Sequence, residues 1–149
     1  MGGATVLMVS GEKLPSNVKA IVEDCGYTSV NDELAYQLKR LYHLKPEPSI
    51  SELSSVVEKR AGYSMKEASA EQQVKKSTTP ILFIHGDADT FVPFEMAQRL
   101  YDACPSEKEL LIVHGAGHAE SAIVDPIDYK ARVAFFLLRH IDEPMLAVR

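Results

Sequence analysis

Two short apolar segments, each followed by a polar loop and a helical pattern, constrain the fold of this chain more than any other feature. They are residues 80–85 and 109–113. Both are too short for a typical helix and have little polar face, so each is predicted to be a buried strand. A third β-rich run, residues 18–25, ends at Gly26 and is predicted to be a strand buried on both faces. Strands that alternate with helices predict an α/β fold, a parallel sheet flanked by helices.

Three further segments are predicted to be helices that cover this sheet. Gly2 and Gly3 lead into the apolar residues 5–9, which predict a buried helix entered through a crowded turn. The helix after the second strand is predicted to begin at Pro93, because proline suits the first helical position. The last helix is predicted to begin after Asp125, a capping residue type. Its apolar face would contain Tyr129, Val133, Phe136 and Leu137.

Residues 27–77 contain no convincing strand and are predicted to be an inserted helical cap. Leucines at 34, 38 and 41 and apolar residues at 53, 56 and 57 repeat at helical spacing on either side of a Pro-rich joint at 45–48. Ser49 and Glu52 have the spacing of a capping box, and Gly62 is placed to end the second helix.

Composition excludes several classes of partner. The 149 residues match one domain, and 16 basic against 21 acidic residues give a formal charge of −5 without a basic block, so nucleic acid is not an expected partner. Apolar runs such as 81–84 and 134–138 are far too short to cross a bilayer, no leader pattern opens the chain, and we expect a cytoplasmic protein. Cys25 and Cys104 form no CxxC pair and are expected to be buried thiols.

Titratable side chains gather in the loops after residues 80–85 and 109–113, the second and third predicted strands along the chain. In a parallel sheet, the loops at the carboxyl ends of the strands meet at one edge, where ligands bind. A carboxylate that accepts the Nδ1 proton of a histidine leaves Nε2 free as a general base. Asp89, in the first loop, and His118, in the second, are therefore the predicted acid–base pair.

The other polar residues of these loops have weaker claims. His85 ends an apolar strand and is expected to be buried and bonded to the backbone, and Asp87 is expected to brace its loop. His114 is expected to face water. The candidates for lining a substrate pocket are Tyr27, Phe91, Val92 and Glu120, although Phe91 and Val92 are equally suited to packing against the next helix, and Glu120 to facing water.

The two loops together resemble a known family. The segments His85-Gly86-x-x-Asp89-x-x-Val92-Pro93 and Gly115-Ala116-Gly117-His118 are similar to the acid and base segments of α/β-hydrolases, in the family's chain order. The resemblance implies that Asp89 orients His118, that His118 is the general base, that no cofactor is needed, and that the cap shapes the substrate pocket. Similar capped hydrolases include esterases and relatives of aminopeptidases.

The nucleophile expected from this resemblance is not evident. The family carries it in Gly-x-Ser-x-Gly, and no such motif occurs in this chain. The opening Met1-Gly2-Gly3-Ala4 is similar to the sequence that directly follows the serine, which would make the Met1 backbone N–H an oxyanion donor. We therefore expect residues 1–149 to be the carboxyl-terminal part of one hydrolase domain, with only the later strands of its sheet, and nearly inert alone.

The sequence thus predicts a serine hydrolase that cleaves a small ester, amide or thioester through an acyl-enzyme. Two alternatives remain open at this point. A metal-dependent hydrolase would use imidazoles and carboxylates as ligands, namely His85, Asp87, Asp89, His114 and His118. A non-catalytic half-domain would instead pair through its open sheet edge, as a homo-oligomer or with a complementing amino-terminal half.

Overall fold

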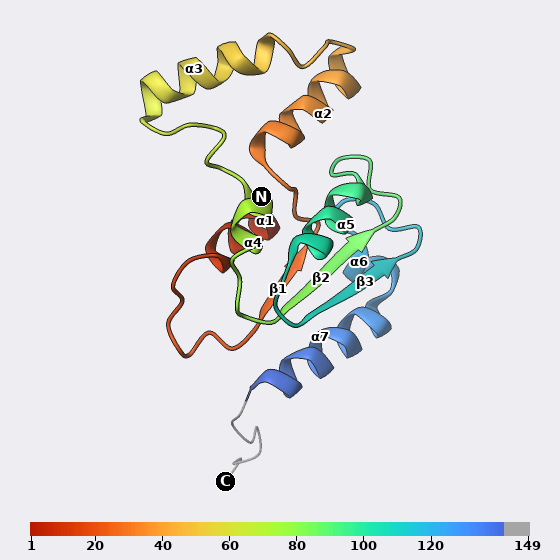
Figure 1. Ribbon diagram of the computed structural model, residues 1–149. Coiled ribbons are helices and arrows are strands. Elements are labelled where there is room, and N and C mark those ends of the chain that lie inside the picture. The colour runs from red at the N-terminus through yellow and green to blue at the C-terminus, as the bar shows by residue number, and fades with distance from the viewer. Residues whose placement is uncertain (142–149) are drawn as a thin grey trace.

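A three-stranded parallel sheet forms the centre of the molecule. In the computed structural model, which describes residues 1–141, the strands β1 (Ile21–Asp24), β2 (Ile81–Gly86) and β3 (Lys108–Val113) follow the order β1-β2-β3 (Figure 1). Register pairs Ile21 with Ile81 and Ile81 with Lys108, so the strands end close together at their carboxyl edge. All six residues of β2 are buried. The predicted α/β class and parallel sheet are confirmed.

Helices cover both faces of the sheet because alternate residues of β2 point in opposite directions. Helices α1 (Gly2–Ser10), α4 (Ala70–Val74) and α5 (Phe94–Ala103) enclose one apolar cluster. Its fully buried side chains include Leu7, Val74, Ile81, Phe83 and Leu100. On the other face, α7 (Pro126–His140) closes a cluster of Leu82, Ile84, Leu111, Val113, Ala116 and Phe136, and the short α6 (Ser121–Val124) precedes it.

Two helices of the predicted cap project away from the sheet (Figure 1). They are α2 (Val30–Tyr42) and α3 (Ser49–Ala61), joined through the Pro-rich segment as predicted, and Gly62 ends α3 with a φ of 75°. The predicted capping box is wrong. Pro48 occupies the cap position and Ser49 already lies inside the helix, so the serine side chain caps nothing.

The end of the predicted 27–77 insertion belongs to the core. An antiparallel bridge pairs Ser69 with Ser29, so the chain returns after α3 to the place where α2 begins. Ala70 and Val74 of the unpredicted helix α4 then pack, fully buried, beside α1. The helices that project are therefore α2 and α3 alone among the described residues.

Burial of α1 and β1 is less complete than their sequences predict. Val6 and Val9 of α1 are 38% and 47% exposed and line an open hollow between α1 and β1, together with Val18 and Val22. In β1, which is shorter than predicted, Ile21 and Glu23 are buried, whereas Val22 and Asp24 are half-buried. None of the helices in the described part of the chain has the length and apolar character needed to cross a membrane.

Candidate active site

The loops after β2 and β3 are pressed together at the carboxyl edge of the sheet. Gly86 allows this approach, since a Cβ on it would lie 2.1 Å from the backbone oxygen of Ala116. That same oxygen accepts a hydrogen bond from the Ala88 N–H at 3.1 Å. A residue with any side chain at position 86 would force the two loops apart.

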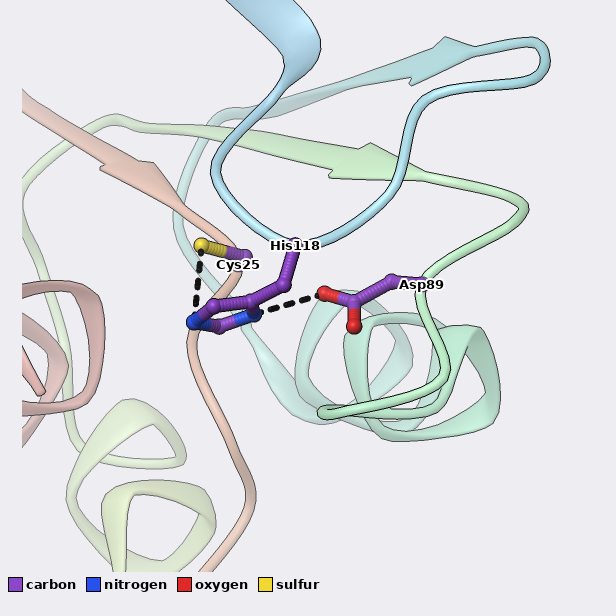
Figure 2. A group of neighbouring side chains, drawn as sticks. All are labelled: Cys25, Asp89 and His118. Carbon is purple, nitrogen blue, oxygen red and sulfur yellow. Dashed lines mark hydrogen bonds and ion pairs between the residues drawn. The ribbon is translucent and has the colours of Figure 1, made fainter.

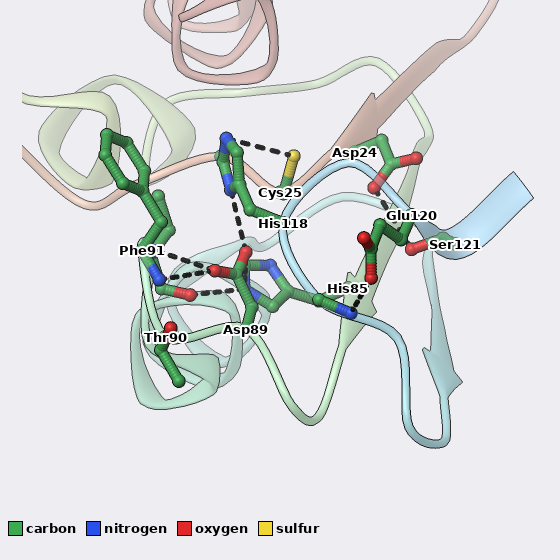
Figure 3. Close-up of polar contacts among 12 residues, drawn as sticks. Asp24, Cys25, His85, Asp89, Thr90, Phe91, His118, Glu120 and Ser121 are labelled. Atoms are coloured by element: carbon green, nitrogen blue, oxygen red, sulfur yellow. Dashed lines mark hydrogen bonds and ion pairs between the residues drawn. The ribbon is translucent and has the colours of Figure 1, made fainter. Parts of the chain in front are cut away.

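Asp89 is held by hydrogen bonds on both of its carboxylate oxygens. Its Oδ1 accepts from the backbone N–H groups of Phe91 and Val92 at 2.8 and 2.9 Å (Figure 3). Its Oδ2 lies 2.8 Å from His118 Nδ1 (Figure 2). The residue is only 6% exposed. A buried carboxylate with these partners is fixed in position and ready to orient a histidine.

His118 presents its two ring nitrogens to different neighbours. Nδ1 faces the Asp89 carboxylate, which selects the tautomer with the proton on Nδ1. Nε2 lies 3.9 Å from Cys25 Sγ (Figure 2). The His118 side chain remains 31% exposed, so Nε2 of this tautomer is available to accept a proton. The structure thus brings together the two residues that the sequence predicts as a pair.

Cys25 is a neighbour of this pair that the sequence reasoning missed. Cys25 directly follows β1 and adopts a φ of 52°. The sequence predicts that both cysteines are buried thiols; Cys104 is buried, whereas Cys25 is half-buried. Burial, with a contribution from the Asp24 carboxylate, raises the pKa of the Cys25 thiol to about 11. The thiol is therefore protonated at neutral pH. Its position after a strand, at the same edge as both loops, was the signal that could have found it.

The remaining loop residues take bracing positions. His85 is fully buried and its Nε2 lies 2.9 Å from the Val92 carbonyl oxygen, as predicted (Figure 3). Asp87 accepts from the Gly115 N–H at 2.7 Å, as expected of a loop brace, and lies 2.7 Å from Nδ1 of the exposed His114. The hydrogen bonds from His114 and Gly115 lower the pKa of Asp87.

The cluster of ligands that the alternative metal-dependent hydrolase would need is not assembled among residues 1–141. Asp87 and His114 pair with each other at the surface, while His85 is enclosed beneath Asp89, because the loop turns these side chains in different directions. Among the described residues, the potential ligand atoms that lie within 4.8 Å of one another belong to Cys25, Asp89 and His118. The His118 ring lies between the other two, with Nδ1 toward Asp89 at 2.8 Å and Nε2 toward Cys25 at 3.9 Å.

The candidate pocket residues differ in what they expose. Phe91 is 49% exposed and its ring centroid lies 4.9 Å from that of His118, so it forms an apolar wall beside the pair. Val92 is 1% exposed and presents no side-chain surface. Glu120 is exposed and accepts from the Gly117 N–H at 3.0 Å. Tyr27 is half-buried.

The start of α1 lies at the same edge of the sheet. A Cβ on Gly3 would lie 2.7 Å from the carbonyl oxygen of Asp24, the last residue of β1, and 3.0 Å from the nitrogen of Gly26, which follows the strand. Met1 precedes this turn as the cap residue of α1 and is 87% exposed. Its assignment as an oxyanion donor stays a prediction.

The parallel sheet, its flanking helices and the paired loops at its carboxyl edge define the class of α/β-hydrolases. Residues 7–119 match the serine hydrolase (FSH1) family, and the chain belongs to this family.

Relatives and solved structures agree with that assignment. The chain is 29% identical over 137 residues to the uncharacterized protein YqkD of Bacillus subtilis, covering 92% of this chain and 45% of YqkD. It is 41% identical over 46 residues to human alpha/beta hydrolase domain-containing protein 17C, covering 31% of this chain and 14% of that protein. It therefore spans less than half the length of either relative.

The fold resembles that of known hydrolases at low sequence identity. The Pyrococcus furiosus esterase Pf2001 superposes with a TM-score of 0.64 at 21% identity, over 92% of this chain and 50% of that one. An acylaminoacyl peptidase of Pyrococcus horikoshii superposes with a TM-score of 0.69 at 17% identity, over 97% of this chain and 23% of that one. These similarities establish the fold.

Proposed function

We propose that this chain supplies the acid and the base of a serine hydrolase that cleaves a small ester, amide or thioester through an acyl-enzyme. The observation that carries the proposal is the Asp89–His118 hydrogen bond of 2.8 Å, which directs the unprotonated Nε2 into the site. Membership of the serine hydrolase family supports the same chemistry.

The proposed mechanism gives each ring nitrogen of His118 a different role: Nδ1 bonds to Asp89 throughout, and Nε2 accepts and returns protons. A serine hydroxyl next to Nε2 transfers its proton there as its oxygen attacks the substrate carbonyl. Asp89 stabilises the imidazolium through the Nδ1–H bond, and Nε2 then protonates the leaving group. Water, activated by the same nitrogen, hydrolyses the acyl-enzyme and regenerates the serine.

The mechanism also needs a serine nucleophile next to Nε2 and backbone N–H groups that bind the oxyanion. Among residues 1–141, the side-chain hydrogen-bond contacts of His118 are with Asp89 and Cys25. We assign the nucleophile to a segment that precedes Met1 and ends in Gly-x-Ser, with the Met1 N–H as one oxyanion donor. The position of the first turn of α1 beside the end of β1 supports this assignment.

Fluorophosphonate labelling tests the proposal. We expect one label on a protein in which a segment ending in Gly-x-Ser precedes Met1, and essentially none on residues 1–149 alone. His118→Ala and Asp89→Asn should each slow labelling by orders of magnitude, whereas Cys25→Ala should leave it unchanged. Loss of the label in Cys25→Ala would contradict this expectation and would make the thiol a part of the reacting site. A folded extended protein that stays unlabelled would overturn the proposal.

We also propose that the open side of α1 and β1 is covered in the complete enzyme, by its amino-terminal half or by a second copy of the chain. Strand β1 is an outer strand of the described sheet, and the apolar residues Val6, Val9 and Val18 beside it are 38%, 47% and 37% exposed. Sedimentation of residues 1–149 should show a self-associating species. A monomeric chain at high concentration would argue against pairing between copies.

A further inference from the structure

The cap helix α2 contacts the loop that carries Asp89 through one polar face. Glu33, Tyr36, Gln37 and Arg40 recur at helical spacing and therefore lie on the same side of the helix. The Tyr36 hydroxyl donates to the Thr90 carbonyl oxygen at 3.0 Å, and an Arg40 Nη donates to the Thr90 hydroxyl at 3.3 Å. These contacts span 54 and 50 positions of sequence and join the cap to the site.

Gln37 makes the most direct of these contacts. Its Nε2 donates to the Phe91 carbonyl oxygen at 2.8 Å and to Glu33 Oε1 at 2.7 Å, which uses both protons of the amide. Phe91 in turn donates its backbone N–H to Asp89 and places its ring against His118. Gln37 is thus one residue away from the carboxylate and from the imidazole of the predicted pair.

Glu33 orients Gln37 from within the cap. It is 9% exposed, and its Oε2 is buried with no hydrogen-bond partner among the described residues. Burial is the largest cause that raises the pKa of Glu33, and the hydrogen bond from Gln37 opposes this effect. The charge of Asp89 raises the pKa of Glu33 further, whereas the charge of His118 lowers it. The carboxylate therefore lies within electrostatic range of the pair.

The first turn of α2 is itself anchored to the core. The Ser29 side chain caps the helix by accepting from the Asp32 N–H at 3.0 Å, and the Thr28 hydroxyl donates to the Asp32 carboxylate at 2.6 Å. The same carboxylate pairs with Arg99 of α5 at 3.0 Å. An anchored helix can hold a loop in place, whereas a freely hinged one could not.

We infer that Glu33 and Gln37 are positioning residues, through which cap helix α2 fixes the Asp89 loop and the Phe91 wall against His118. This inference rests on the proposed function, since it concerns the same acid–base pair. A cap that is docked through Gln37 keeps the Phe91 and Val92 N–H groups on Asp89. A cap that is displaced releases this loop and loosens the pair, so the position of the cap sets the activity of the site.

The test compares Gln37→Ala with Gln98→Ala in the whole protein. Gln98 is a matched control, since within residues 1–141 its side-chain amide bonds only to Asp102 of its own helix. We expect Gln37→Ala to lower kcat on a p-nitrophenyl ester by about tenfold to a hundredfold, with KM nearly unchanged. It should also speed hydrogen exchange at the Phe91 and Val92 amides. Gln37→Lys, which keeps donors at this position, should restore part of both.

The exchange measurement separates this inference from the proposed function, because it needs no turnover and can be made on residues 1–149. Exchange that speeds up only in Gln37→Ala supports the inference even where no ester is cleaved. Unchanged exchange at Phe91 and Val92 in a folded Gln37→Ala protein overturns it, and so does an equal effect of Gln98→Ala. A Gln37→Ala protein that does not fold transfers the test to Glu33→Ala, which should give the same faster exchange.

Discussion

Glu23 should make the stability of this protein fall as the pH rises. The residue lies on β1, is 1% exposed and accepts one hydrogen bond, from the Gly26 N–H at 2.8 Å. Its other carboxylate oxygen is buried without a partner in the described part of the chain. Burial, with a contribution from the charge of Asp24, raises the pKa of Glu23 from 4.5 to about 8.

The size of the effect follows from proton linkage. Between pH 4.5 and 8 the folded protein keeps a proton on Glu23 that the unfolded chain releases, so the free energy of unfolding falls as pH rises. Raising the pKa of Glu23 from 4.5 to about 8 corresponds to about 5 kcal/mol in total. About 3 to 4 kcal/mol of this should be lost between pH 5 and pH 8.

Urea unfolding of wild type and Glu23→Gln at several pH values checks this reasoning. Glutamine keeps the shape and an acceptor for Gly26 but does not titrate, so this variant should lose the steep fall and exceed wild type in stability at pH 8. Glu58→Gln, on the exposed surface of α3, is the control and should keep the wild-type slope. If the free energy of unfolding fell equally steeply with pH in wild type and in Glu23→Gln, Glu23 would not be the group that causes the fall.

Three further perturbations have defined outcomes. The pKa of the Cys25 thiol is about 11, against an ordinary value of 9.0, so the rate at which iodoacetamide alkylates it should keep rising up to at least pH 10. Peptide mass spectrometry measures this rate, and a rate that levels off by pH 9 would contradict the raised pKa. Gly86→Ala should destabilise the fold by about 3 kcal/mol in urea titrations, since its Cβ would overlap the Ala116 carbonyl, and an unchanged midpoint would show that the loops yield. Asp125→Ala should cost about 1 kcal/mol, because the Asp125 side chain caps α7 by accepting from the Asp128 N–H at 3.0 Å; a loss below the error of the titration would contradict it.

The sheet and the predicted pair follow from local sequence rules. Uninterrupted apolar runs such as 81–84 require burial on both faces, and parallel strands bring the loops after them to one edge. These two rules are enough to place Asp89 beside His118. The cap at Asp125 is equally local, because the capping side chain bonds to a backbone group only three residues away.

Tertiary contacts account for what the sequence did not predict. Cys25 looks like the last residue of a strand, and only the turn that follows β1 brings its thiol to His118. The contact between Gln37 and Phe91 depends on how the cap folds back over the loop, which no spacing along the chain encodes. The Ser49 capping pattern failed because α3 begins at Ser49, with Pro48 as its cap residue.

The tautomer of His118 shows directly whether Asp89 prepares this histidine to act as a general base. Ring ¹⁵N resonances of residues 1–149, measured above the pH at which the ring is protonated, report which nitrogen carries the proton. We expect a proton on Nδ1 and none on Nε2, and loss of this fixed state in Asp89→Asn. A proton on Nε2 in the wild-type chain, or an identical spectrum for Asp89→Asn, would contradict it.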